Sequence, residues 1–203
     1  MSTADRTIDP RILEAARSEF LTKPYKDVSL RDICQKAGVT TGAFYKRYPN
    51  KEALFDVLVA PTLELIDRYS SGRISFNYDQ LNKNDMKTVW EQTEETQKSM
   101  IDMLYDNREG FLLLLCHAEG TKYCNFIHDF VNKVTQYSMT FIREVYARGI
   151  IDTVIDEEEL HRLFTAYWTT MFEPLIHGLS REQALSHSRI VAKLFNWSAV
   201  LGF

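Results

Sequence analysis

The stretch from Val28 to Phe55 constrains the fold of this 203-residue chain more than any other. Ser29 is followed three residues later by Asp32, a spacing that predicts a capping box at the start of a helix. Gly38 can supply the positive φ that a tight helix end requires, and Thr40 is a good N-cap for a second short helix. Two short helices joined by a glycine turn predict a helix-turn-helix.

The second of these helices has a surface suited to DNA. From Ile33 to Lys51 the sequence contains no Asp or Glu but several cations. Free backbone N–H groups at a helix N-terminus favour an anion such as phosphate, and small side chains there can enter the major groove. We expect Thr41, Gly42 and Ala43 to face base edges. The residues expected to hold phosphates are Ser29, Thr40, Tyr45, Lys46, Arg47, Tyr48 and Lys51.

These residues resemble the DNA-binding domain of the TetR family of bacterial transcriptional regulators. The family pattern runs from a small residue and Gly, through Tyr-x-His-Phe, to a Lys and a Leu. The corresponding positions here are Ala37, Gly38, Val39, Thr40, Thr41, Gly42, Ala43, Phe44, Tyr45, Lys46, Arg47, Tyr48, Lys51 and Leu54. The His-Phe pair of the family is replaced by Arg47 and Tyr48, which keep a cation and an aromatic ring.

The resemblance implies a transcriptional regulator, specifically a repressor that binds a palindromic operator as a homodimer and is released by a small-molecule ligand. The expected partners are therefore double-stranded operator DNA, an unidentified effector and a second copy of the chain. In the family the last two helices form a four-helix bundle across the dimer axis, so we expect the homodimer contact there. We expect no enzymatic activity, no cofactor and no metal.

The charge distribution agrees with a DNA-binding N-terminus. Residues 1–52 contain 10 Lys and Arg against 7 Asp and Glu, a net +3. Residues 53–203 contain 14 against 21, a net −7, which gives the total of −4. Because local potential steers association with DNA, a negative total charge is no obstacle. We expect a helix-turn-helix domain at 1–52 and a helical effector-binding and dimerisation domain at 53–203.

The remaining pattern predicts an all-α fold. Asp9 is expected to cap a first helix that completes a three-helix N-terminal domain. A fourth helix is expected to start near Asn50 and to contain Pro61, and a Ser-, Gly- and Asn-rich loop is expected from Ser70 to Asn84. A fifth helical pattern carries Val89, Thr93 and Met100 at helical spacing.

Further helix signals follow in the C-terminal half. Thr121 is expected to open a long helix that ends at Gly149, and Asp156 to cap the next one. Ser180 and Gln183 have the spacing of a capping box, after which one last helix is expected to run to Val200.

Aromatic residues and methionines accumulate in the C-terminal half. Each of them individually is explained by a packed core, but together with a few polar groups they could also line a ligand cavity between helices. The candidate ligand-binding residues are Thr93, Gln97, Met100, His117, Phe130, Tyr137, Phe141, Trp168, Phe172 and His177.

Alternatives to a ligand-controlled regulator remain open. A helical enzyme could use His117 and Glu119 in the cavity, although no nucleophile elbow, P-loop or dinucleotide fingerprint is present. A regulator controlled by a protein partner or by oxidation of Cys116 and Cys124 is another alternative. The spacing of the Cys and His residues between Cys116 and His128 disfavours a zinc site.

The sequence also predicts the compartment. Three cysteines without a paired spacing suit a reducing cytosol. The first ten residues are polar and lack the apolar core of a signal peptide. The longest apolar run, Phe111–Cys116, is too short to span a bilayer. We therefore expect a cytoplasmic protein that does not interact with a membrane.

Overall fold

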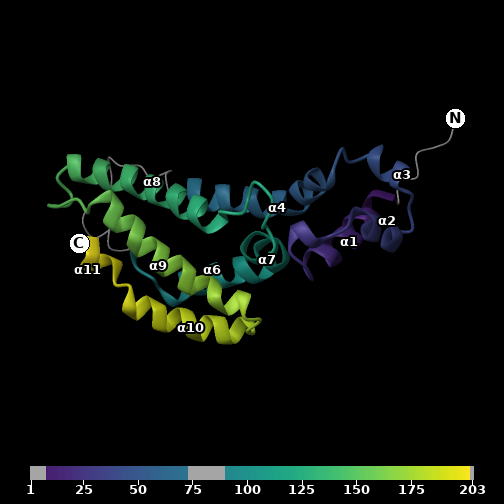
Figure 1. Cartoon of the computed structure of the whole chain (residues 1–203). Helices are drawn as coiled ribbons and strands as arrows, with labels where there is room; N and C mark the ends of the chain where they lie inside the picture. Colours follow the sequence, from purple (N-terminus) through teal and green to yellow (C-terminus); the bar gives the residue numbers. More distant parts are fainter. Residues whose placement is uncertain (1–7, 73–89, 202–203) are drawn as a thin grey trace. The chain divides into compact units, whose positions relative to one another are not determined.

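The computed structural model describes residues 8–72 and 90–201, and within these ranges it contains helices and no strand (Figure 1). The expected all-α fold is confirmed. The chain divides into two compact units. The first unit comprises Met1–Leu65 with Arg108–Phe126, and the second comprises Ile66–Asn107 with Ile127–Phe203. The expected functional division at residue 52 stays a prediction.

The first unit contains a three-helix head and the segment that returns to it. Its elements are α1 (Ile8–Phe20), the 3-10 helix η1 (Tyr25–Asp27), α2 (Leu30–Ala37), α3 (Thr41–Tyr45), the first part of α4 (Lys51–Gly72) and α7 (Arg108–Cys116). Helix α2 packs on α1 and on α3. The rings of Phe20, Tyr25 and Phe55 contact one another, with centroids 5.2 Å apart for Phe20 and Phe55, and they join α1, η1 and α4.

The turn between α2 and α3 has the expected geometry. Gly38 adopts φ 65°, a left-handed conformation that side chains with a Cβ rarely occupy. The Thr40 hydroxyl accepts a hydrogen bond from the Ala43 N–H at 3.1 Å and so caps α3. The helix-turn-helix predicted from these two residues is therefore present.

The start of α2 differs from the prediction. The Ser29 hydroxyl accepts from the Arg31 N–H at 3.2 Å, so Ser29 is an N-cap. The reciprocal bond of a capping box, from the Ser29 N–H to Asp32, is not among the contacts that define this cap. The motif prefers Glu or Gln at this position, and an Asp side chain is one methylene shorter than Glu.

Two other expected helix ends are also corrected. Helix α1 already includes Ile8, so Asp9 lies in its first turn and is not its N-cap. Helix α4 starts where expected, and it is capped by Asn50, whose side-chain oxygen accepts from the Ala53 N–H at 2.8 Å. Because α4 continues through Pro61 to Gly72, the loop predicted from Ser70 begins too early. The rest of that loop, and Val89, lie outside the described residues.

The second unit is a helical bundle. Its elements are the last part of α4, α6 (Glu94–Asp106), α8 (Phe126–Ala147, which begins at the edge of the first unit), α9 (Glu157–Ile176), α10 (Arg181–Leu194) and α11 (Trp197–Leu201). Helix α10 lies along both α6 and α9 (Figure 1). Phe130 of α8 packs edge-on against Trp168 of α9, with ring centroids 4.8 Å apart.

The caps of α9 and α10 are those expected, but two other boundaries are not. Asp156 accepts from the Glu159 N–H, and the capping box at Ser180 is complete. Helix α8 begins at Phe126 and not at Thr121, because the Thr121 hydroxyl donates to a nearby carbonyl within a short turn. The single last helix is divided in two, since the Asn196 side chain caps a new helix, α11.

Candidate nucleic-acid interface

Helix α3 presents a continuous exposed surface. Phe44 is fully buried and anchors the helix to the first unit. Tyr45, the next residue, is 58% exposed although its side chain is a large aromatic ring. We call the exposed residues around α3 the recognition surface; they are Thr40, Thr41, Gly42, Tyr45 and Lys46. Ala43, also expected at base edges, is half-buried beside them.

Arg47 and Tyr48 support α3 from behind. The Arg47 Nε lies 2.8 Å from a carboxylate oxygen of Asp9, and its Nη1 donates to the Ala43 carbonyl at 3.3 Å. The Tyr48 ring packs against Phe44, with ring centroids 5.6 Å apart, and burial raises the pKa of the Tyr48 hydroxyl. Both residues therefore fix the orientation of α3, and their assignment to phosphates stays a prediction.

Lys51 is also engaged within the fold. Its ammonium donates to the carbonyls of Tyr25 at 2.6 Å and Val28 at 2.8 Å, and lies 4.1 Å from the centre of the Tyr25 ring. Burial lowers the pKa of Lys51. An ammonium group has three donors, so one remains for a phosphate. Lys51 thus ties the start of α4 to η1, and its phosphate contact stays a prediction.

A segment far along the sequence completes the first unit. The Tyr25 N–H donates to the His117 carbonyl at 2.9 Å, and Lys26 forms an ion pair with Glu119 at 2.7 Å. Lys122 forms a second ion pair with Asp56 at 2.8 Å. The sequence predicts this segment as part of the C-terminal domain, because no local pattern indicates a contact between residues about ninety positions apart.

His117 and Glu119 therefore occupy positions other than those expected. His117 is half-buried in the first unit, its Nδ1 has no hydrogen-bond partner among the described residues, and burial lowers its pKa. Glu119 is engaged by Lys26. Neither residue lines the cavity described below, so an enzyme that uses them in that cavity is not supported. Cys116 and Cys124 are exposed and are not joined in a disulfide.

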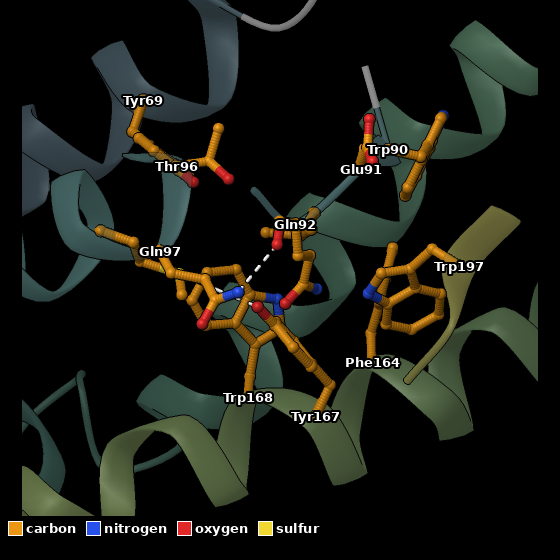
Figure 2. Close-up of a pocket in the computed structure, with 12 residues that line it drawn as sticks. Tyr69, Trp90, Glu91, Gln92, Thr96, Gln97, Phe164, Tyr167, Trp168 and Trp197 are labelled. Atoms are coloured by element: carbon orange, nitrogen blue, oxygen red, sulfur yellow. Dashed lines mark hydrogen bonds between the residues drawn. The ribbon is translucent and has the colours of Figure 1, made fainter. Parts of the chain in front are cut away.

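The second unit contains a small cavity of about 70 Å³ (Figure 2). Its walls come from α4, α6, α8, α9, α11 and the residues before α6. The lining residues are Tyr69, Trp90, Glu91, Gln92, Thr96, Gln97, Met100, Val134, Phe164, Tyr167, Trp168 and Trp197. Three of the ten candidate ligand-binding residues are among them: Gln97, Met100 and Trp168.

The other candidates lie elsewhere. Phe130, Phe141 and Phe172 are buried in the core, and Tyr137 is half-buried without lining the cavity. Thr93 is the N-cap of α6, and exposed His177 pairs with Glu173 at 2.8 Å. Their role in ligand binding stays a prediction. Helical spacing shows that a residue lies on an apolar face, but it does not show which space that face lines.

Gln97 connects the cavity to helix α10. Its side-chain Nε2 donates to the Gln92 carbonyl at 2.7 Å, the contact drawn as a dashed line in Figure 2. Its Oε1 accepts from the Ser188 hydroxyl of α10 at 3.1 Å. Gln97 and Ser188 are both buried, which is expected only for polar groups whose hydrogen bonds are satisfied.

The described residues contain neither a metal-binding cluster nor a helix that could span a membrane. Residues 8–72 and 90–201 contain no group of three or more His, Cys, Asp and Glu residues that could hold a metal ion. No helix in these ranges combines the length and hydropathy needed to cross a bilayer.

Sequence comparisons match the N-terminal part of the chain. The family model described as bacterial regulatory proteins, tetR family, matches residues 12–58, which extend from α1 into α4. The Transposon Tn10 TetC protein of Escherichia coli is 30% identical over 101 residues, which make up 50% of this chain and 46% of that protein. The chain spans less than half the length of the curated relatives that it matches.

Comparisons of structure extend over nearly the whole chain. Salmonella enterica GusR is similar with a TM-score of 0.61 and 19% identity, over 99% of this chain and 98% of its own. A cysteine mutant of the TetR family transcriptional regulator CifR, determined with 26-base-pair double-strand operator DNA, has a TM-score of 0.61 at 17% identity, over 95% of this chain and 98% of its own. At these identities the similarity shows the fold alone.

Proposed function

This chain belongs to the TetR family of bacterial regulatory proteins, and we propose that it is a repressor that binds a palindromic operator as a homodimer and is released by a small molecule. One observation carries the proposal: the segment matched by the family model displays an exposed recognition surface on a rigidly supported α3. Such a regulator acts on DNA in the cytoplasm.

The recognition surface supports an assignment of roles. Thr41 and Gly42 are exposed and small, so they can approach base edges in the major groove. Lys46 is exposed, and a lysine at the end of a recognition helix can neutralise a phosphate. The exposed Tyr45 hydroxyl can donate to another phosphate oxygen.

Exposed apolar residues on the last helices support the homodimer. Ile190 is 58% exposed, Leu194 74% and Val200 41%. Apolar side chains on one helix face gain about 25 cal/mol per Å² when they are covered. A twofold dimer covers such a face with its own copy and doubles the number of base pairs read.

The hydrogen bond between Gln97 and Ser188 links the cavity to α10, a helix of the proposed dimer contact. Gln97 lines the cavity, whereas Ser188 belongs to α10, which also carries Ile190 and Leu194. A ligand that fills the cavity can shift the Gln97 side chain and, through its bond to Ser188, change how α10 packs. To weaken operator binding a hundredfold, the coupling free energy must be roughly 3 kcal/mol.

The proposal is tested by selecting operator sequences from a pool of random DNA duplexes with the purified protein. We expect the enriched sequences to have twofold symmetry and to bind two chains per duplex. Lys46→Ala should weaken binding to every sequence, whereas changes at Thr41 should alter the preferred sequence. Recovery of no enriched sequence, or of one bound by a single chain, would contradict the proposal.

A further inference from the structure

We propose that the cavity of the second unit recognises the head group of an organic cation, in particular a quaternary ammonium. The inference rests on the proposed function in one respect, because it names the chemistry of the effector. Binding of such a cation is itself a property of the second unit and can be measured without DNA.

The first observation is the aromatic character of the cavity. Six of its twelve lining residues have aromatic rings: Tyr69, Trp90, Phe164, Tyr167, Trp168 and Trp197. Phe164 and Trp197 meet edge to face with centroids 5.0 Å apart, and Trp90 stacks on Phe164 at 6.4 Å. In Figure 2, Phe164 and Trp197 lie on the side of the cavity opposite Gln97. The negative faces of aromatic rings attract cations, most strongly when the ion is shielded from water.

The second observation is the charge of the lining. Among the described residues that line the cavity, Glu91 is the one charged residue, and none of them is Lys, Arg or His. A carboxylate or phosphate ligand would therefore enter the cavity without a countercharge, which is strongly unfavourable. A cation would find the Glu91 carboxylate near it. Glu91 is exposed, so its charge remains solvated while the cavity is empty.

The third observation concerns hydrogen bonding. One buried polar group of the lining is the Gln97 amide, and both of its ends already have partners, the Gln92 carbonyl and the Ser188 hydroxyl. A neutral polar ligand that pairs with the Gln97 amide must break one of these bonds to gain its own. A quaternary ammonium has no N–H donor and needs no hydrogen bond, so it is the cation that this lining suits best.

The size of the cavity limits the part of the ligand inside it to a compact head group. The cavity volume is about 70 Å³, which excludes an extended molecule from the interior. Glu91 and Thr96 line the cavity and are exposed residues, so a longer substituent can extend into solvent beside them.

The chain supplies its own reporter for this site. All three of its tryptophans, Trp90, Trp168 and Trp197, line the cavity. Tryptophan fluorescence of the full chain can therefore be titrated with choline, with its neutral isostere 3,3-dimethyl-1-butanol, and with the anion 3,3-dimethylbutanoate. We expect a saturable change with choline, at least tenfold weaker binding of the isostere, and no binding of the anion. Equal binding of choline and its isostere, tighter binding of the anion, or no saturable change with choline would overturn the proposal.

Two variants locate the effect in the cavity. Glu91→Gln removes the charge of an exposed side chain and should weaken choline binding several-fold. Glu95→Gln is the matched control, since Glu95 is an exposed acid of α6 that does not line the cavity. Equal weakening of choline binding by the two substitutions would contradict the role given to Glu91. So would choline binding that neither substitution weakens.

The outcome of the choline titration can be distinguished from the outcome of the operator selection. Specific operator binding without saturable choline binding would leave the repressor proposal standing and overturn this one. Saturable choline binding by a protein that never releases the operator would support the cation site and contradict release by this ligand.

Discussion

The Lys51 ammonium lies 2.6 Å from the carbonyl oxygen of Tyr25 and 4.1 Å from the centre of the ring of the same residue. This contact joins the first turn of α4 to η1, the element against which residues 117–119 also dock. Lys51 thus holds the three-helix head together, whatever else it contacts.

Lys51→Ala is expected to reduce the free energy of unfolding by about 1–3 kcal/mol, because two half-buried carbonyls lose a charged donor. Urea unfolding followed by circular dichroism measures this change. The variant should also weaken binding to every DNA sequence and lower the salt slope by about 1 if the remaining donor holds a phosphate. Unchanged stability would contradict the support role, and an unchanged slope would contradict the phosphate contact.

Helices α4 and α7 meet at Gly110 and Thr62. A Cβ placed on Gly110 would lie 1.9 Å from the Thr62 hydroxyl oxygen and 3.0 Å from its Cβ. Gly110→Ala should therefore destabilise the protein by about 1–3 kcal/mol through overpacking. Gly42→Ala is the control, because the nearest atom to a new Cβ there, the Thr40 hydroxyl oxygen, is 3.9 Å away. Equal melting temperatures for the two variants would show that the α4–α7 contact is looser than described.

Stability should depend on pH through His117. Burial lowers its pKa in the folded chain, and a backbone hydrogen bond with Lys23 opposes this only in part. As pH falls below the ordinary histidine value of about 6.5, the unfolded chain binds the proton first. The stability contributed by neutral, half-buried His117 is therefore complete above that pH, and this contribution is lost as pH drops from about 6.5 through the folded pKa.

His117→Gln should reduce this loss when urea unfolding is compared at neutral and mildly acidic pH. His177→Gln, which changes an exposed histidine of the second unit, should retain the wild-type loss. A wild-type pH profile in the His117→Gln variant would contradict this prediction.

Leu194→Asp should shift the protein from dimer to monomer. Leu194 is 74% exposed in the single chain, and a carboxylate on each side of a twofold contact would be desolvated and repelled. We expect the dimer dissociation constant to rise at least tenfold in analytical ultracentrifugation. Val57→Asp is a control at an exposed valine of the first unit, and it should leave the assembly unchanged.

The sequence predicts those parts of the fold whose signals are local. Gly38 and Thr40 define the turn before α3 within three residues, and Ser180 with Gln183 does the same for α10. The cavity could not be predicted in this way. Trp90 and Trp197 are more than one hundred positions apart, and only tertiary packing brings their rings to 6.3 Å.

The sequence identifies the candidate residues for DNA contact. It does not separate the exposed candidates from those whose side chains hold α3 in place. Arg47 and Lys46 are adjacent cations with the same local signal. One is paired with Asp9 of α1 and the other is exposed, a difference that depends on a residue almost forty positions away.

The most direct test of the central claim is the salt dependence of operator binding by the wild type and by Lys46→Ala, measured by fluorescence anisotropy on the selected duplex. Lys36→Ala is the control, because the Lys36 ammonium is engaged by Ser18 at 2.6 Å and Glu19 at 3.1 Å of α1. We predict that Lys46→Ala weakens binding and lowers the salt slope by about 1, whereas Lys36→Ala retains the slope. An unchanged affinity and slope for Lys46→Ala would show that α3 does not face the DNA.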